Sequence, residues 1–303
     1  MHNPIKKVAI VGGTHGNELT GIYLINKFQK TPELVERESF ETHLLHANKK
    51  AIDQCRRYID SDLNRKFDVD ALKDDDLYDY EELAAKQLNR ILGPKGSDEA
   101  QMDFIVDLHT TTSNMGLSIV IGTDSALAWQ AAAYLKEKNP QVHIFRWEGD
   151  TDHSPFVDSI AKHGFAIEVG AVPQGVLRAD LFFGTEKLIQ HLLDFFEKFN
   201  RGEHKVPYGE LEIYDSVRLV DFPRDQDGEI AAMVHPYLQD NDYSPVEKGD
   251  PLFVAMDGRE IAYQGEEKLH VLFINEAAYY EKGFAMCLAK KRTLELALFD
   301  PGL

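Results

Sequence analysis

Three features are scarce in this sequence: long apolar runs, cysteine and positive charge. No stretch of about 18 apolar residues occurs, so the sequence predicts no membrane-spanning helix. The two cysteines, Cys55 and Cys287, are too few for a disulfide framework, and we expect both to be reduced packing residues. The first residues enter an apolar strand without the hydrophobic region of a signal peptide. These absences predict a cytoplasmic protein.

The shortage of positive charge restricts the possible partners. The chain carries 33 lysines and arginines against 51 aspartates and glutamates, a formal net charge of −18. Nucleic acid and anionic membrane surfaces would both be repelled by such a chain. A small anionic substrate is not excluded, because a pocket can carry a local field opposite in sign to the net charge.

Strands and helices alternate over the first 200 residues. Apolar runs at residues 8–11, 40–47, 104–109, 117–121, 142–145 and 165–169 predict strands, and helical spacing marks residues 19–30, 80–92, 126–138 and 186–199. Residues 55–67 are polar and predict a functional loop. The alternation is typical of an α/β fold with a mostly parallel sheet flanked by helices.

The pattern changes after residue 200. Short apolar runs at residues 210–214, 216–222, 252–256, 269–274 and 284–289 are separated by turn signals such as Asp227-Gly228 and Asp257-Gly258. This is the pattern of a smaller antiparallel β domain. We place the boundary near residue 205, which gives a catalytic domain over residues 1–205 and a β-rich domain over residues 206–303.

Ionisable side chains stand at the ends of three predicted strands. His15 and Glu18 lie in the glycine-rich turn after residues 8–11, His109 ends the strand at 104–109, and Glu168 lies near the end of the strand at 165–169. Ligand sites of parallel sheets gather at the carboxyl ends of strands, so these side chains are expected to meet.

Two histidines and one glutamate form a known ligand set for catalytic zinc, which leaves a position for water. His15, Glu18 and His109 fit that set. Glu168 leaves an apolar strand, and a partly desolvated carboxylate there could take the proton of an activated water. The plainer alternatives are a turn histidine at His15, a helix-start glutamate at Glu18 and a structural ion pair at Glu168.

The polar loop supplies candidate cations. Arg56, Arg57 and Arg65 could stabilise an oxyanion, and the adjacent Asn64 and Arg65 could grip a substrate carboxylate. The alternative is that these arginines pair with Asp60 and Asp62 on the surface. Asp62 or Asp107 could instead orient a ligating imidazole.

The turn at residues 12–16 (GGTHG) also admits a different class of function, a phosphate-binding loop of a nucleotide-binding module. The sequence offers neither a G-x-G-x-x-G pattern nor a lysine followed by serine or threonine at the end of the loop. The metal hypothesis is therefore the stronger one.

Six blocks of sequence resemble the aspartoacylase family. They are VAIVGGTHGNELTG (residues 8–21), RYIDSDLNR (57–65), VDLHTTTSNMG (106–116), IEVGAVPQGVLRAD (167–180), DFPRDQDGEIA (221–231) and INEAAYYEKG (274–283). They occur in order over nearly the full length. The resemblance implies a zinc amidohydrolase with a carboxypeptidase-like α/β domain, a mostly parallel mixed sheet flanked by helices, and a C-terminal β domain that shapes the substrate channel. It also implies a homodimer or a larger oligomer.

The resemblance assigns roles to the matching residues. His15, Glu18 and His109 would bind one zinc ion per chain. Glu168 would be the general base and then the acid, and Arg57 would polarise the scissile carbonyl and hold the oxyanion.

Further roles concern the substrate, an N-acyl-L-amino acid. Asn64 and Arg65 would bind its α-carboxylate, and Tyr279 would reach the site from the second domain. Without the resemblance, Tyr279 would be taken for a packing aromatic.

One position departs from the family. Ten residues before Glu168, aspartoacylases carry an arginine that binds the side-chain carboxylate of the substrate, and this chain has Asp158. Another cation, Arg178 or Lys162, would have to replace it. N-acetyl-L-aspartate is the first expectation from overall resemblance, and N-acyl aromatic amino acids, the substrates of the related aminoacylase branch, are the alternative because of Asp158.

Overall fold

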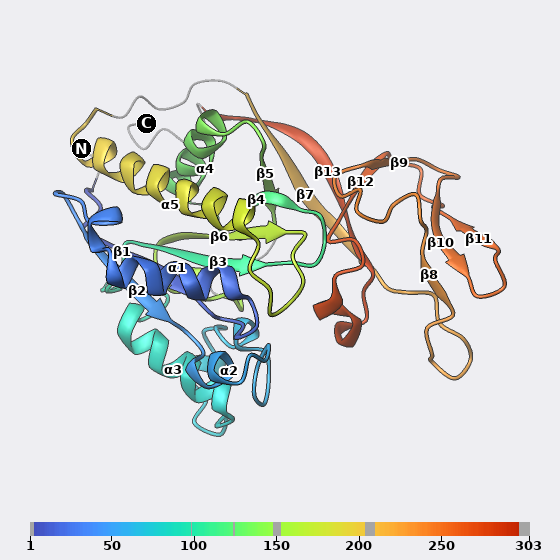
Figure 1. Ribbon diagram of the computed structural model, residues 1–303, viewed down its shortest axis with the longest axis horizontal. Coiled ribbons are helices and arrows are strands. Elements are labelled where there is room, and N and C mark those ends of the chain that lie inside the picture. The colour runs from blue at the N-terminus through green and yellow to red at the C-terminus, as the bar shows by residue number, and fades with distance from the viewer. Residues whose placement is uncertain (1–2, 98, 124, 148–152, 204–209, 297–303) are drawn as a thin grey trace.

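The structure is a computed structural model that describes residues 3–97, 99–123, 125–147, 153–203 and 210–296. A mixed sheet of ten strands runs through the molecule in the order β2-β1-β3-β6-β4-β5-β7-β13-β12-β9 (Figure 1). Its first part contains β1 (Lys7–Gly12), β2 (Glu41–His46), β3 (Phe104–Thr110), β4 (Gly116–Ile121), β5 (Val142–Arg146) and β6 (His163–Gly170). The pairs β1–β2, β1–β3, β3–β6 and β4–β5 are parallel, whereas β4 and β6 are antiparallel.

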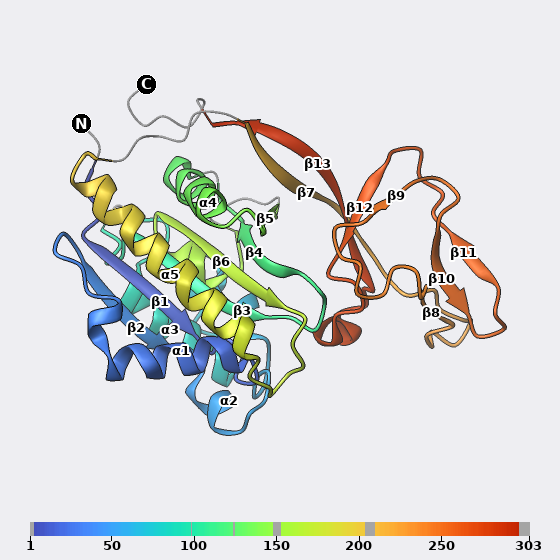
Figure 2. The ribbon, with the colours of Figure 1, turned by 45° about the horizontal axis from the view of Figure 1, so that its top comes forward.

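Helices cover both faces of this part of the sheet. The helices α1 (Leu19–Lys30), α4 (Ala126–Lys138) and α5 (Ala179–Asn200) pack on one face, where Phe28, Trp129 and Phe196 are fully buried (Figure 2). The helix α3 (Tyr80–Leu92) packs on the opposite face through Leu88 and Leu92. The short helix α2 (Lys49–Asp53) follows β2. The predicted layers are confirmed, although α5 begins seven residues before the expected start at residue 186.

The C-terminal strands divide between two sheets. The long strands β7 (Glu210–Val220) and β13 (Met286–Glu295), with β12 (Leu269–Leu272) and β9 (Pro245–Val246), continue the large sheet, because β7 pairs with β5. The strands β8 (Ala232–Val234), β10 (Pro251–Ala255) and β11 (Glu260–Ala262) form a separate three-stranded sheet. Residues 210–214 and 216–222 were expected to form two strands, but residues 210–220 form one. The predicted boundary near residue 205 lies outside the described residues.

The glycine-rich turn after β1 needs its glycines for close approach of two backbone segments. Gly13 has a φ of 70°, a region that favours glycine. A Cβ atom on Gly16 would come within 2.1 Å of the carbonyl carbon of Ala51 in α2, so a larger residue cannot fit. The turn is held in place by Ala47 and Asn48, which donate their backbone N–H groups to the carbonyls of Gly12 and Gly13. His15 and Glu18 are thereby fixed beside the end of β3.

The remaining polar segments are short 3-10 turns. They are Pro32–Leu34, Leu63–Arg65, Ala71–Lys73, Val157–Ile160 and Ala277–Lys282. The turn at Leu63–Arg65 lies inside the predicted functional loop, and the turn at Ala277–Lys282 brings Tyr279 from the C-terminal part of the chain. No helix among the described residues is long and apolar enough to cross a membrane.

Candidate functional site

Glu18 lies between two histidines, and each of its carboxylate oxygens accepts a hydrogen bond from one of them. Its Oε1 is 2.6 Å from Nδ1 of His15, and its Oε2 is 2.9 Å from Nδ1 of His109. These side chains are buried, with 3%, 3% and 5% of Glu18, His15 and His109 exposed. The candidate ligand atoms of the three residues all lie within 4.8 Å of one another. The structure therefore brings the three predicted metal ligands together.

Two further carboxylates fix the histidine rings from behind. Oδ1 of Asp62 is 2.9 Å from Nε2 of His15, and Oδ2 of Asp107 is 2.5 Å from Nε2 of His109. A carboxylate accepts a hydrogen from Nε2, which leaves the lone pair of a neutral imidazole on Nδ1. Both Nδ1 atoms face Glu18 and donate hydrogen bonds to it here. If a metal ion replaced these two protons, the two Nδ1 lone pairs and the Glu18 carboxylate would be available to it together.

The donor set fits a zinc ion. Burial alone would raise the pKa of the Glu18 carboxyl, but His15 and His109 lower this pKa far below its usual range. For His109, burial lowers the pKa, and the adjacent Asp107 and Glu18 raise it well above the ordinary value. The carboxylates thus favour positive charge at the point between the rings. Two imidazole nitrogens and one carboxylate oxygen are a ligand set used by catalytic zinc.

Arg57 lies against this cluster. Its guanidinium donates to Oε1 of Glu18 at 3.2 Å and to Oδ2 of Asp62 at 3.3 Å. Burial lowers the pKa of Arg57, but the nearby carboxylates of Glu18 and Asp62 raise it by more than burial lowers it. The pKa therefore lies above its usual value, and the side chain stays charged. One alternative from the sequence was that the arginines pair with Asp60 and Asp62 on the surface. An arginine does pair with Asp62. However, this pair is not on the surface, because Arg57 lines the pocket and Asp62 is buried behind it. Arg56 is the arginine that faces solvent.

Asn64 and Arg65 reach the pocket from the turn that follows Asp62. The backbone N–H of Asn64 donates to Oδ1 of Asp62 at 3.0 Å, which fixes the start of the turn. The Asn64 amide nitrogen lies 3.3 Å from Nε2 of His109, and its oxygen accepts from the backbone N–H of Val157. The Arg65 guanidinium lies 5.1 Å above the ring of Phe156. Asn64 is therefore buried against His109, whereas Arg65 is more exposed and donates to the backbone carbonyl of Asn64 at 2.7 Å.

Glu168 stands next to His109 across the sheet. The two residues are register partners of β6 and β3, so their side chains lie on the same face. Burial raises the pKa of the Glu168 carboxyl to about 8, Glu18 and Glu276 add to this effect, and His109 opposes it. A raised pKa lets one carboxyl group both accept and donate a proton near neutral pH.

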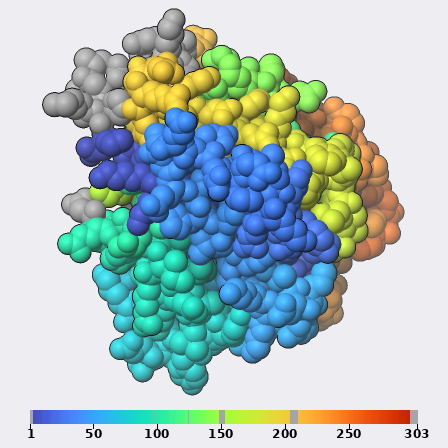
Figure 3. Space-filling model, turned by 60° about the vertical axis from the view of Figure 1, so that its left-hand side comes forward, coloured from blue at the N-terminus to red at the C-terminus, as the bar shows by residue number. Residues whose placement is uncertain are grey.

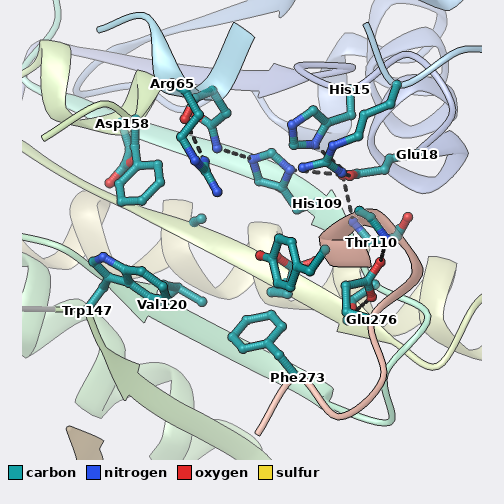
Figure 4. A pocket seen from close by; sticks show the side chains of 18 of the residues that line it. His15, Glu18, Arg65, His109, Thr110, Val120, Trp147, Asp158, Phe273 and Glu276 are labelled. Atoms are coloured by element: carbon teal, nitrogen blue, oxygen red, sulfur yellow. Dashed lines mark hydrogen bonds and ion pairs between the residues drawn. The ribbon is translucent and has the colours of Figure 1, made fainter. Parts of the chain in front are cut away.

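One pocket unites these residues and extends away from the histidines (Figure 4). Its far end contains Asp158 and Trp147, with Val120 and Phe273 beside them. The pocket is lined by two arginines together with apolar, aromatic and acidic side chains: His15, Glu18, Arg57, Asn64, Arg65, His109, Thr110, Thr111, Val120, Gly122, Trp147, Phe156, Asp158, Ala166, Glu168, Phe273, Glu276, Ala278 and Tyr279. The described lining contains no lysine.

Arg178 is the predicted residue that the structure does not bring to the pocket. Its guanidinium forms two bonds of 2.9 Å with the Asp180 carboxylate and donates to the carbonyl of Ala171. It is exposed on the surface, and it is not among the lining residues. Lys162 is likewise exposed and lies outside the lining.

The sequence reasoning missed two buried glutamates that hold the site together. Glu81 of α3 accepts the backbone N–H groups of Ile59, Asp60 and Ser61 at 2.7–3.1 Å, which shapes the loop that carries Arg57. In the sequence, Glu81 looks like an ordinary residue of a helix start.

Glu276 joins the C-terminal part of the chain to the loop after β3. It accepts the backbone N–H of Thr112 at 2.6 Å and that of Ser113 at 3.3 Å, and it also bonds the Thr111 hydroxyl. These residues come two to four positions after His109. The resemblance includes Glu276 in the block at residues 274–283, but no spacing or periodicity distinguishes it.

The family models match both parts of the chain. The succinylglutamate desuccinylase/aspartoacylase catalytic domain matches residues 4–196, and the AstE/AspA barrel-sandwich hybrid domain matches residues 209–291. The chain belongs to the succinylglutamate desuccinylase/aspartoacylase family. The resemblance and the fold class expected from the sequence are thereby confirmed.

Individual relatives are similar over nearly their whole length. A "Probable aspartoacylase" of Trichodesmium erythraeum is 48% identical over 96% of this chain and 99% of its own. The human N-acyl-aromatic-L-amino acid amidohydrolase (carboxylate-forming) is 42% identical, with 96% and 92% covered. The crystal structure of murine aminoacylase 3 superposes with a TM-score of 0.93 at 40% identity and covers 98% of each chain.

The buried carboxyl group of Asp158 predicts a pH dependence of stability. Burial, together with Asp107, raises the pKa of Asp158 from 3.8 to about 7. The folded state therefore holds this proton more tightly than the unfolded state. The stability that results is fully present below about pH 4 and is lost as the pH rises through 7.

Asp158→Asn should remove this dependence, because an amide stays neutral. Between pH 5 and pH 8, the free energy of unfolding of the metal-free wild type should fall by about 3 kcal/mol more than that of the variant. Urea denaturation at both pH values measures this difference. Asp75→Asn, at an exposed position, is the matched control and should follow the wild type. Parallel curves for wild type and Asp158→Asn would show that Asp158 is not protonated in the folded state.

Proposed function

We propose that this chain is a zinc-dependent amidohydrolase that removes the acyl group from an N-acyl-L-amino acid. The observation that carries the proposal is the buried set of His15, Glu18 and His109 with Glu168 beside it. We propose that His15, Glu18 and His109 hold one zinc ion per chain. Such an ion, when bound, supplies a Lewis acid that polarises a carbonyl and lowers the pKa of water.

Glu168 is the proposed proton carrier. It would take a proton from the attacking water and deliver it to the nitrogen of the departing amine, so that the C–N bond breaks as the acyl carbon gains the water oxygen. The raised pKa supports both steps, since the protonated form is accessible near neutral pH. The position of Glu168 opposite His109 supports a role next to the metal ligands.

Arg57 and Arg65 are the proposed anion-binding groups. Arg57 lies against Glu18, so its charge is available to an oxyanion that forms beside the metal ligands. Arg65, with Asn64, would bind the α-carboxylate in bidentate fashion. Tyr279 lines the same pocket, and we propose that it contacts the substrate from the C-terminal side.

The side chain of the substrate would occupy the far end of the pocket. Trp147, Phe156 and Phe273 offer apolar surface there, whereas Asp158 would repel a substrate carboxylate when ionised. This arrangement favours N-acyl amino acids with an uncharged aromatic side chain. The relative from Trichodesmium erythraeum, a "Probable aspartoacylase" at 48% identity, favours the other candidate, N-acetyl-L-aspartate.

A nucleotide-binding module is disfavoured by the same geometry. The turn at residues 12–16 presents His15 to Glu18, and Glu168 lies in the same pocket. The Glu18 carboxylate, and Glu168 when it is ionised, would repel a phosphate group.

Glu168→Gln tests the proton transfer. The amide keeps the shape of the side chain but cannot carry a proton, so kcat should fall by a factor of roughly 10² to 10⁴ while zinc content and substrate KM stay near those of the wild type. Steady-state kinetics with metal analysis measures this. Glu212→Gln, on an exposed part of β7, is the matched control. Turnover within threefold of the wild type would remove Glu168 from the proposed role.

A comparison of two substrates tests the proposed specificity. For the zinc-loaded wild type at pH 8, where Asp158 is mostly ionised, kcat/KM for N-acetyl-L-tyrosine should exceed that for N-acetyl-L-aspartate by roughly tenfold or more, since an unfavourable charge contact of about 1.4 kcal/mol corresponds to a factor of ten. Asp158→Asn should reduce this ratio by improving the reaction of the aspartate substrate. A strong preference for N-acetyl-L-aspartate would instead establish the aspartoacylase reaction. Failure to hydrolyse either substrate would contradict the proposed function.

A further inference from the structure

Lys95 is a buried lysine just beyond the end of α3. The helix itself forms part of an outer face of the molecule, the cyan and teal surface in Figure 3, and its Leu83 and Ile91 are 54% and 46% exposed. Lys95 follows the helix by three residues and is only 6% exposed. Lysine is almost never buried to this extent unless its charge has partners. The partners of Lys95 therefore show what the residue does.

The ammonium group of Lys95 holds both ends of one turn, residues 154–159 (the wall turn). Its Nζ donates to the carbonyl of Ser154 at 2.6 Å and to the hydroxyl of Ser159 at 2.8 Å. Hydrogen bonds from a charged donor are stronger than those between neutral groups, and burial shields these from water. The two ends of the wall turn are therefore fixed to a single buried group.

The wall turn carries two residues of the pocket. Phe156 and Asp158 line the pocket, whereas Lys95 is not among the lining residues and acts from behind the wall. The Ser159 hydroxyl, which accepts from Lys95, donates to the carbonyl of Phe156 at 2.5 Å. Burial raises the pKa of Asp158, and the positive charge of Lys95 opposes this effect. Lys95 thus acts on both lining residues, on one through a hydrogen-bond chain and on the other through its charge.

A third hydrogen bond ties the wall turn to the segment that contains Arg65. Nζ of Lys95 donates to the carbonyl of Phe67 at 2.8 Å, two residues after Arg65. On the pocket side, the Arg65 guanidinium lies 5.1 Å from the ring centroid of Phe156 and bridges the same two segments. Arg65 has its own anchor, because its backbone N–H donates to the carbonyl of Asp62 at 3.0 Å. Lys95 therefore sets the position of the wall turn relative to Arg65.

We propose that Lys95 is a positioning residue for substrate specificity, which holds Phe156 and Asp158 where the side chain of the substrate meets them. This inference rests on the proposed function, in which the side chain of an N-acyl amino acid occupies this end of the pocket. Without the ammonium group, the two serines lose their common partner and the wall turn shifts relative to the α-carboxylate site. The metal ligands and the proposed proton carrier belong to other elements, so they keep their places.

Lys95→Met tests this role, because methionine keeps an unbranched side chain but removes the charge and the hydrogen bonds. The preferred substrate is whichever of N-acetyl-L-tyrosine and N-acetyl-L-aspartate the wild type hydrolyses better, and the reference is N-acetyl-L-alanine, which has only a methyl side chain. The ratio of their kcat/KM values should fall roughly tenfold or more in the zinc-loaded variant, mainly through a higher KM for the preferred substrate. Zinc content should stay at the wild-type level. A general loss of structure would instead lower kcat for both substrates alike.

Ser159→Ala is the second variant. It removes one hydrogen-bond partner of the ammonium group and keeps the charge, so the ratio should fall by a smaller factor, roughly fivefold. If Lys95→Met does not fold, Ser159→Ala alone decides.

Lys86→Met is the matched control. The Lys86 ammonium group also donates to two backbone carbonyls, those of Asp74 and Leu77, but neither residue lines the pocket. Its ratio should stay within about twofold of the wild type, because the same kind of hydrogen bond is lost at a place that does not shape the pocket.

The outcomes separate this inference from the proposed function. Ratios within about twofold of the wild type for both Lys95→Met and Ser159→Ala, or an equal fall in Lys86→Met, would overturn the role of Lys95 alone. A zinc-loaded wild type that hydrolyses none of the three substrates would overturn the proposed function, and this inference with it.

Discussion

The two hydrogen bonds of Glu18 to His15 and His109 are the interaction on which the site depends. A buried carboxylate is costly unless charged or hydrogen-bonded partners surround it. Glu18 has such partners in both imidazoles, in Arg57 and in the backbone N–H of Thr110 at 3.0 Å. Asp62 and Asp107 complete the arrangement behind the rings. Each group is held by the next, so the loss of one leaves another buried charge without a partner.

The fold brings these partners together from distant parts of the chain. The turn after β1 supplies His15 and Glu18, the loop shaped by Glu81 supplies Arg57 and Asp62, and the end of β3 supplies His109. The C-terminal part of the chain contributes as well, because its strand β7 extends the same sheet and Glu276 holds the loop after His109. The pocket is therefore shaped by the whole chain, and its specificity end, at Trp147, Phe273 and Asp158, draws on both parts.

The sequence was sufficient to predict the layers of the fold and the residues that meet at the strand ends. Alternation of apolar runs with helical spacing indicated the parallel sheet, and residues that end adjacent strands must lie side by side, as His109 and Glu168 do. The sequence could not predict that β7 joins the large sheet, because strand pairing between distant segments leaves no local pattern. The roles of Glu81 and Glu276 were also hidden, since each acts on backbone N–H groups far away in the chain. Arg178 was predicted to reach the pocket because it follows Glu168 closely in the sequence. Its guanidinium is instead bonded to Asp180 on the surface, which the sequence does not reveal.

The most direct test of this account is the mode of zinc binding. We expect the chain to take up about one zinc ion, and ¹⁵N NMR of labelled imidazoles should show coordination of His15 and His109 through Nδ1, because Asp62 and Asp107 hold both Nε2 atoms. His43→Ala, on β2, should bind zinc as the wild type does, whereas His15→Ala and His109→Ala should lose the ion. Coordination through Nε2, or zinc content unchanged by loss of either histidine, would contradict the account.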